Sequence, residues 1–276
     1  MITHPPSSTL HTKLTAELLA RREALACLER VTQDGQSLDD ALTPVHTHAK
    51  LSASDKGFAE HLTRAVLKRR CWLEAMLAPL LRHPLHSMPI KAQLLLLMGA
   101  AQLHHMNVPA YAAVNTTVEL AKHLRLHSLS GLMNAVLKNV AKVDASTTAP
   151  NLLKAMPHWL SDRLVKDYGA EQARFLLSAS MDDIHTLDIT VKDAAKLTYY
   201  AEALQGQPMG GTTLRIASGQ DIRSLEGYEA GDWWVQDLAA SLPVHGIRQL
   251  VQGKRVLDAC AAPGGKTMQL AAYGAH

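Results

Sequence analysis

The sequence predicts a multi-domain protein in which an all-α helical bundle is followed by an α/β region. Three observations support this fold class. Residues 13–142 show the apolar spacing of helices almost throughout, and no strand is needed to explain them. After residue 150, short segments with alternating polarity occur between helical segments. The 276 residues, 47% of them hydrophobic and 19% charged, suffice for two domains with separate cores.

The bundle is predicted element by element. Residues 14–31 place leucines on one stripe at helical spacing. Ser37 is a candidate N-cap for the next helix, and Ser54 or Asp55 for a long third helix. Residues 90–106 are apolar nearly all round, which is typical of a buried central helix. The remaining helices of the bundle are expected at residues 110–125 and 130–143.

The pattern changes after the stretch DASTTAPN at residues 144–151, which indicates a linker. Beyond it, strands and helices alternate, as in an α/β region. Helices are expected at residues 157–169, 171–180 and 194–204, and strands at residues 184–191, 212–218, 233–237 and 255–260.

Several classes of protein are excluded by composition. The first residues contain no apolar segment of the kind found in secretion signals. The longest apolar run, residues 94–101, is far shorter than the ~20 residues that span a bilayer. Cys27, Cys71 and Cys260 show no paired spacing, and the histidines have no ligand companions. We therefore expect a soluble, cytoplasmic protein without a disulfide framework, a membrane contact or a metal site.

The charges are distributed unevenly along the chain. Residues 1–150 contain 16 Lys and Arg against 11 Asp and Glu, whereas residues 151–276 contain 12 against 14. A basic half beside an acidic half favours contact of the first half with a polyanion. The cluster Lys68, Arg69 and Arg70 is a candidate for RNA phosphate contacts. An ordinary solvated helix face explains it equally well.

The most specific motif is VLDACAAPGGKT at residues 256–267. One interpretation is a tight turn between a strand and a helix. A second is a phosphate-binding loop, but Cys260 replaces its first glycine and Pro263 lacks an N–H donor. The third is the loop of a class I S-adenosylmethionine-dependent methyltransferase, in which the first strand ends in an acidic residue, here Asp258. Small residues there let a ligand approach the backbone next to a helix N-terminus.

The segment DACAAPGGKT resembles the cofactor loop of the RNA 5-methylcytosine methyltransferases, the bacterial Sun/RsmB family. Residues 233–237 (WWVQD) resemble the segment upstream of that loop, and residues 157–160 (PHWL) resemble the entry to the family's RNA-binding subdomain. The resemblance implies an S-adenosylmethionine site formed by Asp258, Cys260, Ala261, Ala262, Pro263, Gly264, Gly265 and Lys266.

The helical region resembles the antitermination factor NusB, which precedes the methyltransferase core in this family. Residues 97–122 and 131–140 are similar to its central signature. Together the resemblances imply methylation of cytosine C5 in small-subunit rRNA. The implied parts are a tail (1–12), a NusB-like RNA- or protein-binding domain (13–143), a linker (144–156), an α/β RNA-binding subdomain (157–250) and the first strand, loop and partial helix of a Rossmann-like core (251–276).

Members of this family attack cytosine C6 with a cysteine thiolate from Pro-Cys and Thr-Cys motifs, and this sequence contains neither motif. No catalytic residue is therefore assigned, and we expect a truncated member that binds S-adenosylmethionine weakly or not at all and is inactive alone. Two alternatives stay open. The chain is a non-catalytic RNA-binding module, or a separate chain supplies the missing half.

Overall fold

The computed structural model describes residues 14–106, 108–143, 150–181, 186–219 and 221–276. The predicted tail and residues 144–149 of the predicted linker lie outside the described residues. The chain forms two compact units that divide after Met181, and each is considered by itself.

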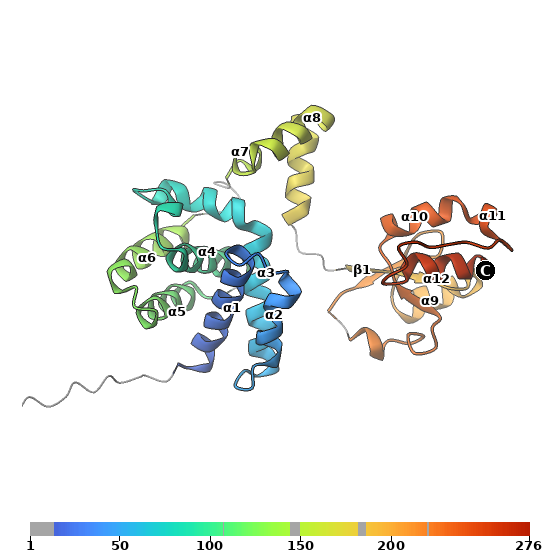
Figure 1. Ribbon diagram of the computed structural model, residues 1–276, viewed down its shortest axis with the longest axis horizontal. Helices are drawn as coiled ribbons and strands as arrows, with labels where there is room; N and C mark the ends of the chain where they lie inside the picture. The colour runs from blue at the N-terminus through green and yellow to red at the C-terminus, as the bar shows by residue number, and fades with distance from the viewer. Residues whose placement is uncertain (1–13, 107, 144–149, 182–185, 220) are drawn as a thin grey trace, which may run out of the picture. The chain divides into compact units, whose positions relative to one another are not determined.

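The described residues of the first unit form helices, grouped around α4 (Figure 1). As predicted, α4 is the buried central helix, since every residue from Leu94 to Gln102 is buried. A Cβ added at Gly99 would lie 2.6 Å from Cδ1 of Leu137, so glycine permits the close packing of α4 and α6. The helices are α1 (Ala16–Thr32), α2 (Leu38–Thr47), α3 (Ala53–Leu77), α4 (Ile90–His105), α5 (Ala110–His123), α6 (His127–Val140), α7 (Leu152–Ala155) and α8 (His158–Met181).

The helix caps agree with the prediction at one site and differ at another. The hydroxyl of Ser37 accepts a hydrogen bond from the N–H of Asp40, so the predicted cap of α2 is confirmed. The prediction of Ser54 or Asp55 as the cap of α3 is wrong, because Ser52 is its N-cap. Ser52 Oγ accepts from the N–H of Asp55, and the Asp55 carboxylate accepts from the N–H of Ser52. This reciprocal pair satisfies two N–H groups that the helix leaves free.

Helices α7 and α8 belong to the first compact unit, although the sequence grouped residues 157–181 with the α/β region. The short helix α7, capped by Asn151, packs against α3. Gly169, with φ 80° and ψ 162°, interrupts α8 between the two helices that the sequence predicted. Because α7, inside the predicted linker, packs against α3, the helical unit extends to Met181.

The second unit contains a four-stranded sheet in the order β2-β3-β1-β4, with every neighbouring pair antiparallel. Strands β1, β3 and β4 match predicted strands. Strand β2 was not predicted, because its sequence QPMG contains residues that are rare in strands. The elements are β1 (Thr186–Val191), α9 (Leu197–Ala203), β2 (Gln207–Gly210), β3 (Thr213–Ala217), β4 (Trp233–Val235), α10 (Leu238–Gly246), α11 (Arg248–Val251) and α12 (Gly265–Ala272).

The two faces of β1 have different roles, because successive side chains of a strand point to opposite faces. Ile189 belongs to the apolar cluster that includes Tyr200 of α9. Asp188, on the other face, accepts two hydrogen bonds from Arg215 of β3, at 2.7 and 2.8 Å, and one from the N–H of Leu238 at 3.1 Å. The hydrogen bonds from Arg215 lower the pKa of Asp188. A buried carboxylate thus ties β1, β3 and the start of α10 together.

Candidate functional site

The motif at residues 256–267 follows an extended segment that pairs with the residues after α12. The N–H of Gly253 donates to Gly274 O, that of His276 to Lys254 O, and that of Val256 to His276 O, at 2.8 to 2.9 Å. The register advances in the same direction on both segments, so they run parallel, and α12 connects them. Parallel neighbours require a crossover of this kind.

The strand predicted at residues 255–260 is not formed, and this expectation is corrected. The pairing involves three hydrogen bonds only, and the segment is not part of the four-stranded sheet. Leu257 is 89% exposed. A regular strand needs a continuous ladder with a neighbour, and residues 257–260 have no such ladder among the described residues.

Asp258 organises the loop that follows. Its Oδ1 accepts a hydrogen bond from the N–H of Cys260 at 3.1 Å, and its Oδ2 accepts one from the hydroxyl of Thr267 at 2.7 Å. The Thr267 hydroxyl, followed by the Cys260 N–H, lowers the pKa of Asp258, so the group is a carboxylate at neutral pH. The carboxylate closes the loop by joining its two ends.

The loop ends at the N-terminus of α12, where backbone N–H groups are free. Gly264 precedes the helix with φ 111°, a conformation that favours glycine. No side chain caps α12, and the N–H groups of Gly265, Lys266 and Thr267 donate no hydrogen bond within the described residues. Ala261 and Ala262 are exposed. Small exposed residues beside free helical N–H groups suit a ligand with an anionic group.

The WWVQD segment is connected to α12 through a buried chain of hydrogen bonds. The indole N–H of Trp234 donates to Gln236 Oε1, and Gln236 Nε2 donates to Gln269 Oε1, at 2.8 and 2.9 Å. Gln269 Nε2 then donates to Ser241 O at 3.0 Å. Both glutamines are at most 5% exposed. These hydrogen bonds hold α12, the helix that follows the loop, against the end of β4 and α10.

The three cysteines occupy different environments. Cys27 of α1 is buried, and burial raises the pKa of its thiol. Cys71 of α3 is half-buried, and its pKa is also raised, chiefly by burial. Both thiols are therefore protonated at neutral pH and poor nucleophiles. Cys260 is exposed in the loop.

The basic triplet of α3 does not form one surface patch. Lys68 is exposed, but Arg69 is only 5% exposed, and Arg70 pairs with Glu74 at 2.8 Å. The helix backbone bends at Arg69, with φ −114° and ψ 15°, and the arginine is buried beside the core. The expectation that Arg69 faces phosphate groups is therefore corrected.

The described histidines and helices form neither a cluster of metal ligands nor a membrane-spanning segment. His104 and His105 pack edge-on against the ring of Trp72, and His104 Nε2 lies 3.0 Å from Val140 O. Over the described ranges, no three His, Cys, Asp or Glu side chains are grouped as metal ligands. No described helix has both the length and the apolar character needed to cross a membrane.

Comparisons with known proteins identify the helical part. The sequence profile of the NusB family matches residues 18–142. Because residues 18–142 match this profile, we call them the NusB domain. This NusB domain contains helices α1 to α6.

The similarity to relatives extends well beyond the NusB domain. The chain is 32% identical over 254 residues to ribosomal RNA small subunit methyltransferase B of Xylella fastidiosa (strain 9a5c), which covers 90% of this chain and 59% of that protein. It is 29% identical over 262 residues to the protein of the same name from Citrobacter koseri, covering 91% of this chain and 60% of the relative. The chain therefore spans about three fifths of the length of these relatives.

A solved structure has a related fold. The crystal structure of PH0851 aligns with 95% of this chain and 61% of its own, with a TM-score of 0.56 and 14% sequence identity. At this level of identity the likeness concerns the fold alone.

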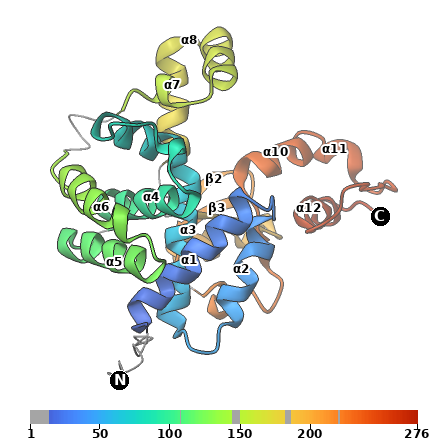
Figure 2. The ribbon, with the colours of Figure 1, turned by 60° about the vertical axis from the view of Figure 1, so that its left-hand side comes forward.

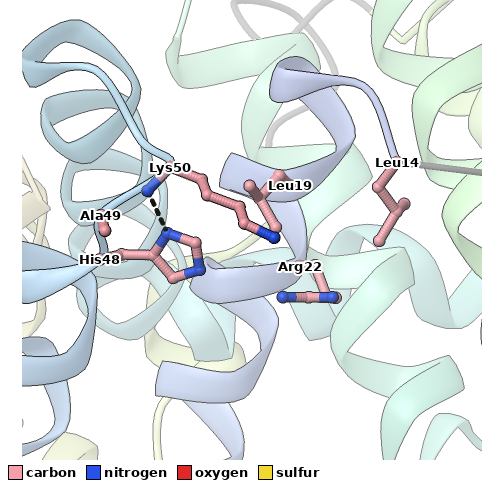
Figure 3. A pocket seen from close by; sticks show the side chains of 6 residues that line it. All are labelled: Leu14, Leu19, Arg22, His48, Ala49 and Lys50. Atoms are coloured by element: carbon pink, nitrogen blue, oxygen red, sulfur yellow. Dashed lines mark hydrogen bonds between the residues drawn. The ribbon is translucent and has the colours of Figure 1, made fainter.

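The NusB domain also contains a small basic pocket that the sequence analysis did not find. Arg22, His48 and Lys50 line a cavity of about 390 Å³ between α1 and the turn after α2 (Figure 3). The N–H of Lys50 donates to His48 Nδ1 at 3.2 Å, and Arg22 pairs with Glu23 at 2.8 Å. Because Glu23 compensates the charge of Arg22, this pocket has less net positive charge than its lining suggests.

Three features of the loop site were missed by the sequence analysis. These are the role of Thr267 as a partner of Asp258, the Gln236–Gln269 contact, and the pairing of residues 253–256 with 274–276. A hydroxyl in the first turn of the helix, nine residues after the aspartate, is a signal that points to the first. The other two depend on contacts between distant parts of the sequence.

Proposed function

We propose that this chain belongs to an S-adenosylmethionine-dependent RNA methyltransferase that modifies cytosine C5 in small-subunit rRNA. One observation carries the proposal. The loop DACAAPGGKT follows the first of two parallel extended segments and leads into the free N-terminus of α12, in a chain about 30% identical to proteins named ribosomal RNA small subunit methyltransferase B. In this proposal residues 251–276 are part of a Rossmann-like core, and residues 157–250 contact RNA.

The loop has the chemistry that the cofactor requires. S-adenosylmethionine supplies the methyl group and carries a carboxylate. We assign its binding to the backbone N–H groups at the start of α12 and to the small residues before them, since both can approach a ligand closely. Asp258 keeps the loop closed through its two hydrogen bonds. The assigned residues are Asp258, Cys260, Ala261, Ala262, Pro263, Gly264, Gly265 and Lys266.

None of the three cysteines is assigned as the nucleophile for cytosine C6. Cys27 and Cys71 lie in the NusB domain, and burial keeps both thiols protonated. Cys260 lies in the cofactor loop, where its N–H is held by Asp258. We therefore propose that residues 1–276 bind ligands but transfer no methyl group to RNA by themselves. Incubation with unmodified small-subunit rRNA and methyl-labelled S-adenosylmethionine tests this, and label in 5-methylcytosine would contradict it.

Cofactor binding is tested by two-dimensional NMR of the ¹⁵N-labelled chain. Titration with S-adenosylmethionine should move the amide signals of residues 258–262 and 264–267 with a weak, saturable response. Ala261→Leu places a bulky side chain on the exposed loop and should abolish the shifts. Ala271→Leu, an equal change at an exposed position farther along α12, is the matched control and should leave them intact.

The outcome also separates the proposal from its main rival, a non-catalytic RNA-binding module. If the loop signals do not respond to S-adenosylmethionine but RNA shifts signals of the NusB domain, the binding module is the better description. Loop shifts that survive Ala261→Leu would refute the assignment of the loop.

A further inference from the structure

A groove in the NusB domain lies between α5 and α6, which run side by side in both views (Figures 1 and 2). Its volume is about 670 Å³. It lies on different elements from the basic triplet of α3 and from the pocket near α1. The side chains that define its chemistry are Tyr111, Val114 and Asn115 of α5, Asn134 and Lys138 of α6, and Lys142 just beyond α6.

Tyr111 gives the groove an exposed aromatic surface. Its side chain is 80% exposed in the first turn of α5. No hydrogen bond or ring contact engages the phenol within the described part of the chain, whereas Tyr199 and Tyr200 of the second unit are engaged in both ways. Val114, one turn along, is nearly buried and forms the floor. An accessible ring beside an apolar floor can stack on a planar group.

The polar side chains of the groove have unused hydrogen-bonding capacity. Across the described ranges, the side chains of Asn115, Asn134, Lys138 and Lys142 form no hydrogen bond and no ion pair. Each amide offers two donors and an acceptor, and each ammonium group offers three donors. Two amides and two ammonium groups therefore converge on the same space without a protein partner.

The charge around the groove favours an anionic ligand. Residues 110–142 contain four Lys and Arg and a single acidic residue, Glu119. Glu119 does not line the groove. Among the residues that the structure describes, no carboxylate forms an ion pair with Lys138 or Lys142, so a polyanion is favoured.

We propose that this groove binds single-stranded RNA. One base stacks on Tyr111, the amides of Asn115 and Asn134 contact its edge, and Lys138 and Lys142 contact the phosphates. A single strand is required, because the bases of a duplex are stacked inside it and cannot reach a groove between two helices. The choice of RNA rests on the proposed function, whereas the groove and its free groups are independent of it.

The test measures binding of the full chain to fluorescein-labelled oligouridylate and oligoadenylate by fluorescence anisotropy at several salt concentrations. Tyr111→Ala should weaken binding about 5- to 150-fold, since a stacked base contributes about 1–3 kcal/mol. Tyr111→Phe retains the ring and should bind as the unaltered chain does. Far-UV circular dichroism should show the same helix content in all three proteins, because the side chain is exposed.

The lysines are tested by the salt dependence. Lys138→Gln combined with Lys142→Gln should reduce the slope of log K against log salt by about 1.4, since each phosphate contact on a single strand contributes about 0.7. The control combines Lys122→Gln with Arg125→Gln, an equal loss of charge on the same hairpin outside the groove, and it should keep the slope.

The result also separates this proposal from the proposed function. If the unaltered chain binds RNA and Tyr111→Ala binds equally tightly, the groove is not the RNA site, although the proposed function stands. The same conclusion holds if the control pair changes the slope as much as the groove pair. If the unaltered chain binds no RNA at all, both proposals fail, and the groove becomes a candidate contact for a protein.

Discussion

The buried chain of hydrogen bonds through Gln236 and Gln269 predicts that Gln269 controls the stability of α12, the helix that follows the loop. Gln269→Met keeps the length and most of the volume of the side chain but removes both of its hydrogen bonds, to Gln236 and to Ser241. The amide of Gln236 is then left buried without an acceptor, while the indole of Trp234 keeps its bond to Gln236.

The cost follows from these two losses. A buried donor left unsatisfied costs about 1–3 kcal/mol, and one lost hydrogen bond costs about 0.5–1.5 kcal/mol net. The substitution should therefore destabilise α12 by about 1.5–4.5 kcal/mol. Because Gln236 and Gln269 interact directly, adding Gln236→Met should cost less than the sum of the single changes.

Amide hydrogen exchange measured by mass spectrometry tests this, with peptides from α12 as the reporter and peptides from α4 as the internal reference. Exchange in α12 should accelerate at least about tenfold, the equivalent of the lower limit of the expected cost. Gln249→Met, at an exposed glutamine of α11, is the matched control and should have no effect. A change of less than about twofold in α12 would show that the buried chain does not hold the helix.

Three further results are expected. Asp188→Asn should destabilise the second unit by about 1.5–3 kcal/mol at neutral pH. Since the folded pKa of Asp188 is lowered, this contribution to stability is present above the unfolded pKa of about 3.9 and is lost as the pH falls through the folded value. Urea unfolding at several pH values, followed by tryptophan fluorescence, should show the free energies of unfolding of the two proteins converging in acid. A difference that stays constant with pH would contradict the reasoning. Thr267→Val should raise the pKa of Asp258 toward its ordinary value, because the largest cause of the lowered pKa is lost; a ¹³C titration of the carboxyl carbon that gives an unchanged pKa would exclude this cause. A fragment of residues 14–143 should unfold cooperatively with a largely helical far-UV spectrum, because α1 to α6 share one buried core; gradual melting would argue against an independent domain.

The sequence by itself predicted the features that depend on local spacing. Helix α4 was recognised because its apolar residues surround the whole helix, and β1 because its residues alternate. The loop from Asp258 to Thr267 was recognised because a run of small residues between a hydrophobic segment and a helix offers few side chains for packing and lets a ligand approach the backbone. Each of these signals lies within about a dozen residues and does not depend on distant contacts.

The tertiary structure decided the features that depend on distant partners. The apolar spacing predicts that Arg69 lies on a helix with buried and exposed faces, but only the packing of the helices shows that its side chain is buried. In the sequence, Asp188 is an ordinary polar residue of a predicted strand. Its ion pair forms because β3 places Arg215, 27 positions later in the sequence, opposite to it. The contact between Gln236 and Gln269 joins residues 33 positions apart. The groove between α5 and α6 likewise exists only because two helices pack side by side, since a hydrogen-bond partner or a cavity wall is fixed by the three-dimensional path of the chain.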